Sequence, residues 1–159
     1  MCRMRNYLPA VHGNVVAQAE TPSPAEQFAR AWLALASKPL VWDARLALAA
    51  QGQADWLAVY DFVPDNPHVG ANSSTPNERV RLAGFTLPSY WPVRGNQCES
   101  ATHHWGTPAE AAQDLANHPT HRDHLLARGW FERHTVYGVG AASHGDGTYY
   151  VVVSAPPEA

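Results

Sequence analysis

The sequence is poor in cysteine and lysine. It has 159 residues but only two cysteines, Cys2 and Cys98, and one lysine, Lys38. Two cysteines cannot form the disulfide framework of a small secreted scaffold. They could pair only if the N-terminal segment folded back, so we expect Cys98 to be a free, partly buried thiol.

Long apolar runs and an excess of basic charge are also absent. No stretch approaches the roughly 18 apolar residues of a membrane span, so we expect no transmembrane segment. The formal net charge is −3 and the pI about 6.3, whereas nucleic-acid-binding domains usually carry a basic excess, so we expect no nucleic-acid partner. The length and the 45% hydrophobic content suit one ordinary domain with its own core, and we expect a monomer.

Helix and strand signals are unevenly distributed along the chain. Capping boxes at Ser23 and Thr107 mark helix starts, and Asp146-Gly147 between two alternating runs indicates a hairpin. The patterns predict helices over 25–37, 43–60, 76–83, 108–117 and 119–126, and strands over 96–104, 131–142 and 148–154. Few, separated strands beside several helices indicate an α+β fold with an antiparallel or mixed sheet.

The chain ends suggest the domain boundaries. Met1 to Arg5 is basic and Ala17-Gln18-Ala19 resembles a cleavage site, but the segment between them is too polar for an ordinary signal core. We therefore expect residues 1–22 to be a flexible tail or residual leader, residues 23–155 to form a single domain, and residues 156–159 to be a short tail.

Histidines gather in the middle of the chain. Six of the nine lie there: His68, His103, His104, His118, His121 and His124. Such a cluster favours metal binding or acid–base chemistry. For any single one of them, a surface position in a polar loop remains the alternative.

Several short patterns follow one another in a characteristic order. A tryptophan-aspartate pair opens the second predicted helix, and a histidine, a short acidic helix, a glutamate-bearing strand, a histidine-arginine pair and a Gly-Val-Gly strand come after it. These patterns are Trp42-Asp43, His68, Glu78-Arg79, Glu99, His121-Arg122 and Gly138-Val139-Gly140.

Taken together, these patterns resemble the CAP superfamily of cysteine-rich secretory proteins, antigen 5 and plant pathogenesis-related proteins, in particular its compact bacterial branch. The resemblance covers about residues 25–154. It implies a three-layer α-β-α sandwich with a mostly antiparallel central sheet. It also implies that His68, Glu78, Glu99 and His121 meet in a central cleft. The sequence departs from the family pattern at Cys98, where glycine is usual, and at Ser100, where asparagine is usual.

The resemblance implies roles for these residues. His68 and His121 would bind zinc or another divalent metal, with water completing the shell. Glu78 and Glu99 would hold the imidazoles or polarise a water. A structural hydrogen-bond network without metal is the alternative. Four residues are expected to support the set: Arg79, Arg122, His118 and His124. A solvated helix face is the alternative for both histidines, and a structural ion pair for Arg122.

Three functions are compatible with this sequence. The first is a secreted, non-enzymatic module at the cell envelope or outside the cell that binds a lipid or another small molecule. The second is a metal-dependent hydrolase with a histidine-bound zinc and Glu99 or Glu78 as general base, although the His-Glu-x-x-His pattern is absent. The third is an intracellular regulatory protein. Thiol chemistry at Cys98 is disfavoured because the neighbouring Glu99 raises the pKa of the thiol.

Overall fold

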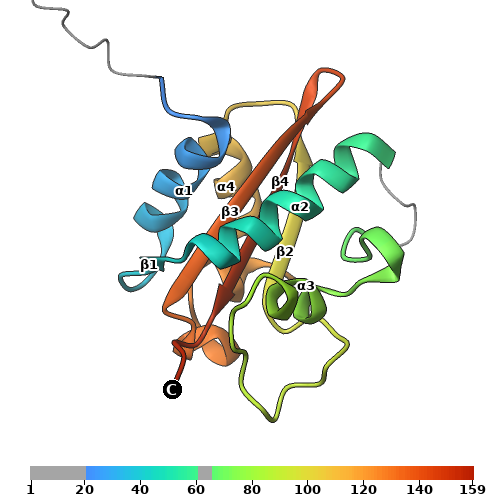
Figure 1. The fold of residues 1–159 in the computed structure, drawn as a ribbon. Coiled ribbons are helices and arrows are strands. Elements are labelled where there is room, and N and C mark those ends of the chain that lie inside the picture. Colours follow the sequence, from blue (N-terminus) through green and yellow to red (C-terminus); the bar gives the residue numbers. More distant parts are fainter. Residues whose placement is uncertain (1–20, 61–65) are drawn as a thin grey trace, which may run out of the picture.

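The computed structural model describes residues 21–60 and 66–159, so nearly all of the predicted tail at 1–22 lies outside the described residues (Figure 1). The helices are α1 (Pro24–Leu35), α2 (Ala44–Tyr60), α3 (Pro76–Leu82), α4 (Pro108–Asn117) and α5 (Arg122–Leu125), with 3-10 turns at Ala71–Ser73 and Gly129–Arg133. The strands are β1 (Val41–Trp42), β2 (Glu99–His104), β3 (Val136–His144) and β4 (Gly147–Ala155). None of these helices is both long and apolar enough to cross a membrane.

Within the described residues the strands form one four-stranded sheet in the order β1-β3-β4-β2. β3 and β4 form an antiparallel hairpin, and β2 pairs antiparallel with β4. The short edge strand β1 runs parallel to β3. The sheet is therefore mostly antiparallel, as predicted, and mixed only through β1.

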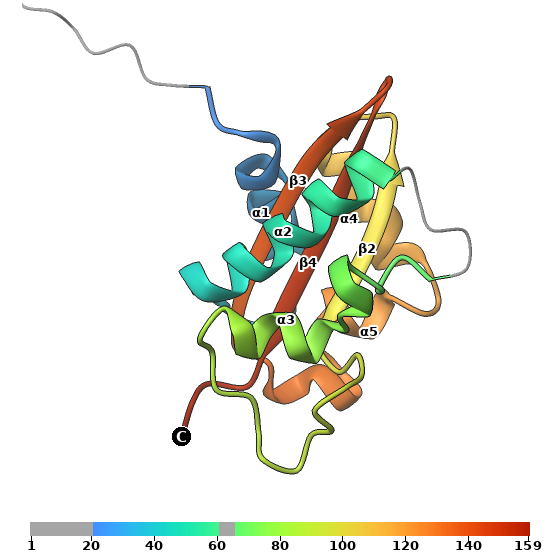
Figure 2. The same cartoon turned by 45° about the vertical axis from the view of Figure 1, so that its right-hand side comes forward.

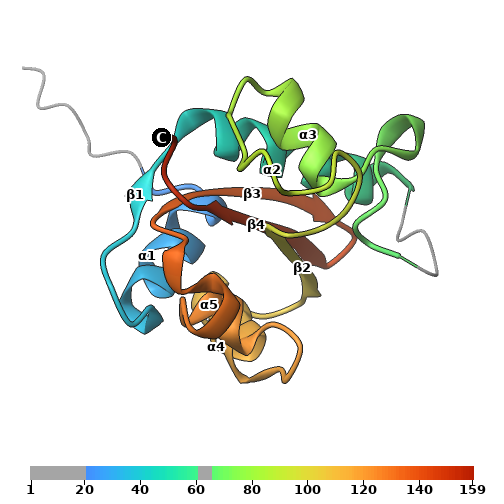
Figure 3. The ribbon, with the colours of Figure 1, turned by 90° about the horizontal axis from the view of Figure 1, so that it is seen from below.

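Helices cover both faces of the sheet (Figure 3). α2 and α3 lie on one face, and α1, α4 and α5 on the other. Each interface has its own apolar core. One contains Leu46, Leu57, Val151 and Val153, and the other Phe28, Trp32, Leu115, Leu125, Tyr150 and Val152. Successive β4 residues thus alternate between the two cores, as a strand buried on both faces requires. The predicted three-layer α-β-α sandwich is confirmed.

Two layers come into backbone contact where α2 crosses β3. A Cβ atom on Gly138 would overlap the backbone of Leu46 and Ala47, and one on Gly140 the backbone of Ala50 and Gln51. The glycines of the Gly-Val-Gly pattern therefore let the helix backbone lie directly on the strand.

Local sequence signals place most of the elements. Capping boxes at Ser23, Thr75 and Thr107 open α1, α3 and α4, each with a proline in the first turn. The Asp43 carboxylate accepts from the backbone N–H groups of Arg45 and Leu46 at the start of α2. Cys98 is a free thiol, as predicted, and is fully buried.

Three sequence predictions were wrong in detail. Residues 131–135 were expected in a strand, but Gly129–Arg133 forms a 3-10 turn, because positive φ at Ala127 (52°) and Gly129 (57°) reverses the chain first. The hairpin turn lies at Gly145-Asp146, one residue earlier than predicted, with φ of 56° at Gly145. The helix expected over 119–126 is regular only from Arg122 to Leu125.

The predicted tail at 156–159 is tied to the domain at one point. The Glu158 carboxylate accepts from the Arg45 guanidinium at 2.8 and 3.1 Å and from the backbone N–H of Thr86 at 2.8 Å.

The contact between α2 and β3 can be tested with two glycine-to-alanine substitutions. Gly140→Ala should lower the free energy of unfolding by about 3 kcal/mol or more, because the clash is with backbone that cannot rotate away. Gly52→Ala, on the exposed side of the same helix with no atom within 4 Å of the added Cβ, should raise it by about 0.5–1 kcal/mol. Urea denaturation of both variants measures the difference, and equal stabilities would contradict the proposed contact.

Candidate functional site

A buried ion pair lies at the start of β2. The Glu99 side chain is 1% exposed and both its oxygens accept from Nη2 of Arg79, at 2.9 and 2.7 Å. Arg79 belongs to α3, and its Nη1 donates to the carbonyls of Ser74 and His68. The guanidinium thus joins α3, β2 and the loop before α3.

His68 is attached to the same carboxylate. Its Nδ1 lies 2.9 Å from Oε1 of Glu99, and its side chain is 21% exposed. The loop that carries it is held to α2, because Nε2 of Gln53 donates to the carbonyls of Pro67 and Val69. A Cβ on Gly70 would clash with the ends of the Gln53 and Arg79 side chains, so a larger residue here would push them away from their hydrogen-bond partners.

The loop before β2 is fixed by α3. The buried Asn77 donates to the carbonyl of Pro92 and accepts from the backbone N–H of Gln97. Asn96 accepts from the backbone N–H of Glu99 at 2.8 Å. These contacts determine where β2 begins, and therefore where the Glu99 carboxylate lies.

The second predicted histidine contacts the next residue of β2. Nδ1 of His121 lies 3.1 Å from Oγ of Ser100. Partial burial, together with the nearby charges of His118 and His68, lowers the pKa of His121 to about 4. The imidazole is therefore neutral at pH 7, the form that binds metals. The indole N–H of Trp32 in α1 donates to the carbonyl of Leu125 at 2.8 Å and holds α5 in place.

The two histidines approach the edge strand from different layers. Glu99 and Ser100 are successive strand residues, so their side chains point to opposite faces of the sheet. α3 lies on the first face and α5 on the second, near the same end of β2 (Figures 2 and 3). Because His68 contacts Glu99 and His121 contacts the next residue, Ser100, both histidines lie at the same end of β2. We call His68, Arg79, Glu99, Ser100 and His121 the histidine–glutamate site.

Glu78, the fourth residue expected in the cleft, interacts elsewhere. Its carboxylate accepts from the backbone N–H and the hydroxyl of Thr75, at 2.8 and 2.9 Å, and pairs with Arg94 at 3.1 Å. These hydrogen bonds, with the Thr75 backbone contact the largest, lower the pKa of Glu78. Glu78 completes the capping box of its own helix and makes none of its observed contacts with His68, Glu99 or His121.

The expected supporting residues divide into two groups. Arg79, with a side chain 11% exposed, and the buried His124 are linked to the site through Glu99 and Ser100. Arg122 is exposed and donates to the carbonyl of Asn117. His118 is also exposed and contacts Thr120 at 2.9 Å, although its ring centroid lies 5.1 Å from that of His121.

Two buried residues connected to the site were not predicted from the sequence. Oγ of Ser154 lies 2.7 Å from Nε2 of His124 and 2.9 Å from Nδ1 of His134. Both Ser154 and His134 are almost fully buried. A serine after three consecutive valines in β4 was the one available signal, because a buried hydroxyl needs a polar partner.

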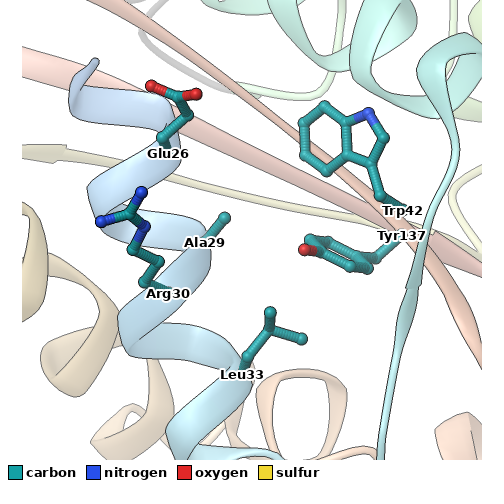
Figure 4. A pocket seen from close by; sticks show the side chains of 6 residues that line it. All are labelled: Glu26, Ala29, Arg30, Leu33, Trp42 and Tyr137. Atoms are coloured by element: carbon teal, nitrogen blue, oxygen red, sulfur yellow. The ribbon is translucent and has the colours of Figure 1, made fainter. Parts of the chain in front are cut away.

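One surface cavity lies apart from this site, and a second borders it through Arg79. A groove of about 360 Å³ runs between α1, which contributes Glu26, Ala29, Arg30 and Leu33, and the Trp42 and Tyr137 side chains (Figure 4). A larger cavity of about 590 Å³ is lined by α3, α2 and the turn after Gly70, and includes Glu78 and Arg79.

Three aromatic side chains that could line an apolar groove differ in exposure. Trp91 is 5% exposed, whereas Tyr90 and Trp105 are 71% and 69% exposed. Trp91 and Tyr90 line a third cavity of about 300 Å³ with Trp130 and His134. Trp105 instead packs against His103.

The donor set suits a metal held by few protein ligands. Within residues 21–60 and 66–159 no group of three or more His, Cys, Asp and Glu side chains could hold an ion. His68 and His121 nonetheless each have Nδ1 held by an oxygen, which fixes the ring and leaves Nε2 as the remaining ligand atom. Each imidazole could therefore offer Nε2 to a metal whose shell is completed by water.

Fold and site together define the class of protein. A three-layer sandwich with a glutamate-anchored histidine at the start of the edge strand, and a second histidine from the facing layer, is a CAP-type domain. The family model described as CAP, cysteine-rich secretory protein family, matches residues 29–155, and the chain belongs to this family.

Comparison of folds gives the same architecture. An outer surface protein from Borrelia burgdorferi superposes with a TM-score of 0.61 and 15% sequence identity, covering 89% of this chain and 100% of that one. At this identity the likeness concerns the fold alone. No curated protein sequence shows a significant match.

The ion pair of Arg79 and Glu99 can be tested by comparing two arginine-to-methionine substitutions. Arg79→Met should lower the free energy of unfolding at pH 7 by about 3–5 kcal/mol, because it leaves Glu99 charged and buried without its partner. Arg94→Met removes a 61%-exposed arginine from Glu78 and should change stability little. Urea denaturation compares the two, and an Arg79→Met variant as stable as Arg94→Met would show that the buried pair does not hold the site.

Proposed function

We propose that this protein is a non-enzymatic, extracellular or cell-envelope ligand-binding module that binds a divalent metal, such as zinc, at His68 and His121. The observation that carries the metal proposal is that both imidazoles are held by an oxygen at Nδ1. Nδ1 of His68 is held by Glu99 and Nδ1 of His121 by Ser100. In both residues Nε2 makes no hydrogen bond with the described part of the chain.

A metal there would supply positive charge that attracts oxygen groups of a ligand. The protein's own contribution is orientation. The carboxylate fixes the ring of His68, and the low pKa of His121 keeps its imidazole neutral without competition from a proton at pH 7.

The contacts of the two glutamates favour binding over hydrolysis. A general base needs a carboxylate oxygen within reach of the attacking water. Both oxygens of Glu99 are occupied by Arg79, one also by His68, and the side chain is 1% exposed. Glu78 is occupied by Thr75 and Arg94. A metal-dependent hydrolase therefore has less support.

The groove beside α1 is the proposed place for a lipid ligand. Leu33, Ala29, Trp42 and Tyr137 give it an apolar lining, with Arg30 at its side (Figure 4). Trp42 is 47% exposed there, which favours a ligand with an apolar chain. The placement outside the cell rests on the cysteine-rich secretory family and on a structural neighbour named as an outer surface protein.

Zinc titration tests the metal site. His68→Ala and His121→Ala should each weaken zinc binding at least tenfold in calorimetry at pH 7, because each removes one of two ligands. His104→Gln, a histidine paired with Asp114, serves as control and should bind like the wild type. Unchanged zinc affinity in both alanine variants would remove the metal proposal. Ester or peptide turnover that Glu99→Gln abolishes would instead support the hydrolase.

A pair of leucine variants tests the groove. Palmitate should raise the melting temperature of the wild type, since a ligand that binds only the folded state stabilises it. Leu33→Asp, which puts a charge in the groove, should reduce the shift by at least half. Leu48→Asp, on the 64%-exposed face of α2, should leave it intact. Equal shifts in all three proteins would show that palmitate does not bind in this groove.

A further inference from the structure

A continuous hydrogen-bonded chain leads from His121 into the interior. Oγ of Ser100 lies 3.1 Å from Nδ1 of His121 and 2.7 Å from Nδ1 of His124. On the far side of His124, Oγ of Ser154 lies 2.7 Å from its Nε2 and 2.9 Å from Nδ1 of His134. We call these five side chains the histidine–serine relay.

The last residue of the relay, His134, lines a cavity. His134 is 2% exposed, its ring centroid lies 5.5 Å from that of Trp91, and both residues line the cavity of about 300 Å³ that Tyr90 and Trp130 also line. Nε2 of His134 and Nε1 of Trp91 are buried and make no hydrogen bond with the described residues. Native structures rarely leave such groups unpaired without a reason.

The two inner imidazoles of the relay are neutral at pH 7. His124 and His134 are each 2% exposed and bond to serine hydroxyls through ring nitrogens, and burial without a charged partner lowers the pKa of both. A neutral imidazole carries one N–H and one bare nitrogen, and a hydroxyl carries one proton. A serine oxygen could accept from both flanking imidazoles, but its own buried proton would then have no acceptor among the contacts of the described residues. Each serine therefore donates to one flanking imidazole and accepts from the other.

Only two arrangements of protons satisfy every link. In the first, His121 and His124 donate to Ser100 and Ser154, and these hydroxyls donate onward to His124 and His134. Nε2 of His121 is then bare and Nε2 of His134 carries a proton. In the second, every donor and acceptor is exchanged, so that Nε2 of His121 carries the proton and Nε2 of His134 is bare.

We propose that the relay couples the histidine–glutamate site to the cavity at His134, so that a metal on Nε2 of His121 fixes the position of the proton on His134. This inference rests on the proposed metal site, since a metal needs the bare Nε2 of the first arrangement. Conversion from the second arrangement takes up one proton at Nε2 of His134, moves one proton across each link and releases one from Nε2 of His121. The number of bound protons is unchanged.

Because of this coupling, a ligand in the cavity changes the affinity of the histidine–glutamate site for a metal. A group that accepts a hydrogen bond from Nε2 of His134 stabilises the first arrangement and strengthens metal binding. A group that donates to that nitrogen weakens it. Because linkage is reciprocal, a metal changes the affinity of the cavity for such a ligand by the same factor.

The structure also indicates which arrangement the metal-free protein adopts. Nε2 of His134 is buried and has no partner among the described residues. A buried N–H without an acceptor is rarer in native structures than a buried acceptor without a donor, so Nε2 of His134 is favoured as the bare nitrogen and Nδ1 as the protonated one. That is the second arrangement, which zinc should reverse.

Nitrogen-15 NMR of the histidine side chains tests the relay directly in the full chain. Without zinc, His121 should be protonated on Nε2, and His124 and His134 on Nδ1. Saturating zinc should move the protons of His124 and His134 to Nε2 together. His144, whose Nδ1 contacts the carbonyl of Ala58 at 2.7 Å, should keep its proton on Nδ1 throughout.

Two further results separate this inference from the proposed function. Ser154→Ala should still bind zinc, but His134 should no longer respond to it, and a full response in that variant would overturn the relay. If zinc does not bind the wild type, the metal site fails, yet the metal-free tautomers still decide the relay. Protonation of His124 on Nδ1 together with His134 on Nε2 would contradict it in either case.

Discussion

The direct contact of α2 with the two glycines of β3 is the constraint on which the other parts depend. It fixes the height of α2 above the sheet, because Gly138 and Gly140 leave no side chain between the two backbones. α2 in turn carries Gln53, whose amide holds the carbonyls of Pro67 and Val69 on either side of His68. The position of a proposed metal ligand thus follows from two glycines on another layer.

The histidine–glutamate site combines a charged and a neutral part on neighbouring residues of one strand. On one face the buried Glu99 carboxylate is balanced by Arg79, so His68 lies against a pair without net charge. On the other face Ser100 offers only a hydroxyl, and burial keeps His121 neutral. The alternation of the strand therefore separates two environments by a single residue, and each holds its imidazole through Nδ1.

The sequence predicted features set by local patterns better than it predicted contacts between distant residues. Capping boxes and the hairpin could be predicted because their signals lie within a few residues, whereas the layer arrangement was expected from the resemblance to the CAP superfamily. The strand expected at 131–135 failed because positive φ at Ala127, which no local rule anticipates, reverses the chain. Glu78 was expected in the cleft by resemblance, yet it sits at the third position of the capping box at Thr75, a local interaction that the sequence already contained. The link from Ser154 to His134 joins residues twenty apart with no shared pattern.

The end of the relay at His134, where Nε2 has no partner among the described residues, suggests why these polar side chains are present. A buried polar network stabilises a fold only when every member is satisfied, and an apolar core of the same volume serves as well. Ser154 follows three buried valines, so an apolar residue would suit the strand. The network instead ends at His134, which lines a cavity and whose Nε2 has no partner among the described residues, and at its other end on the half-buried His121. A purely structural network would close on itself, whereas one that begins at a ligand site and ends at a cavity has the form expected of a connection between them.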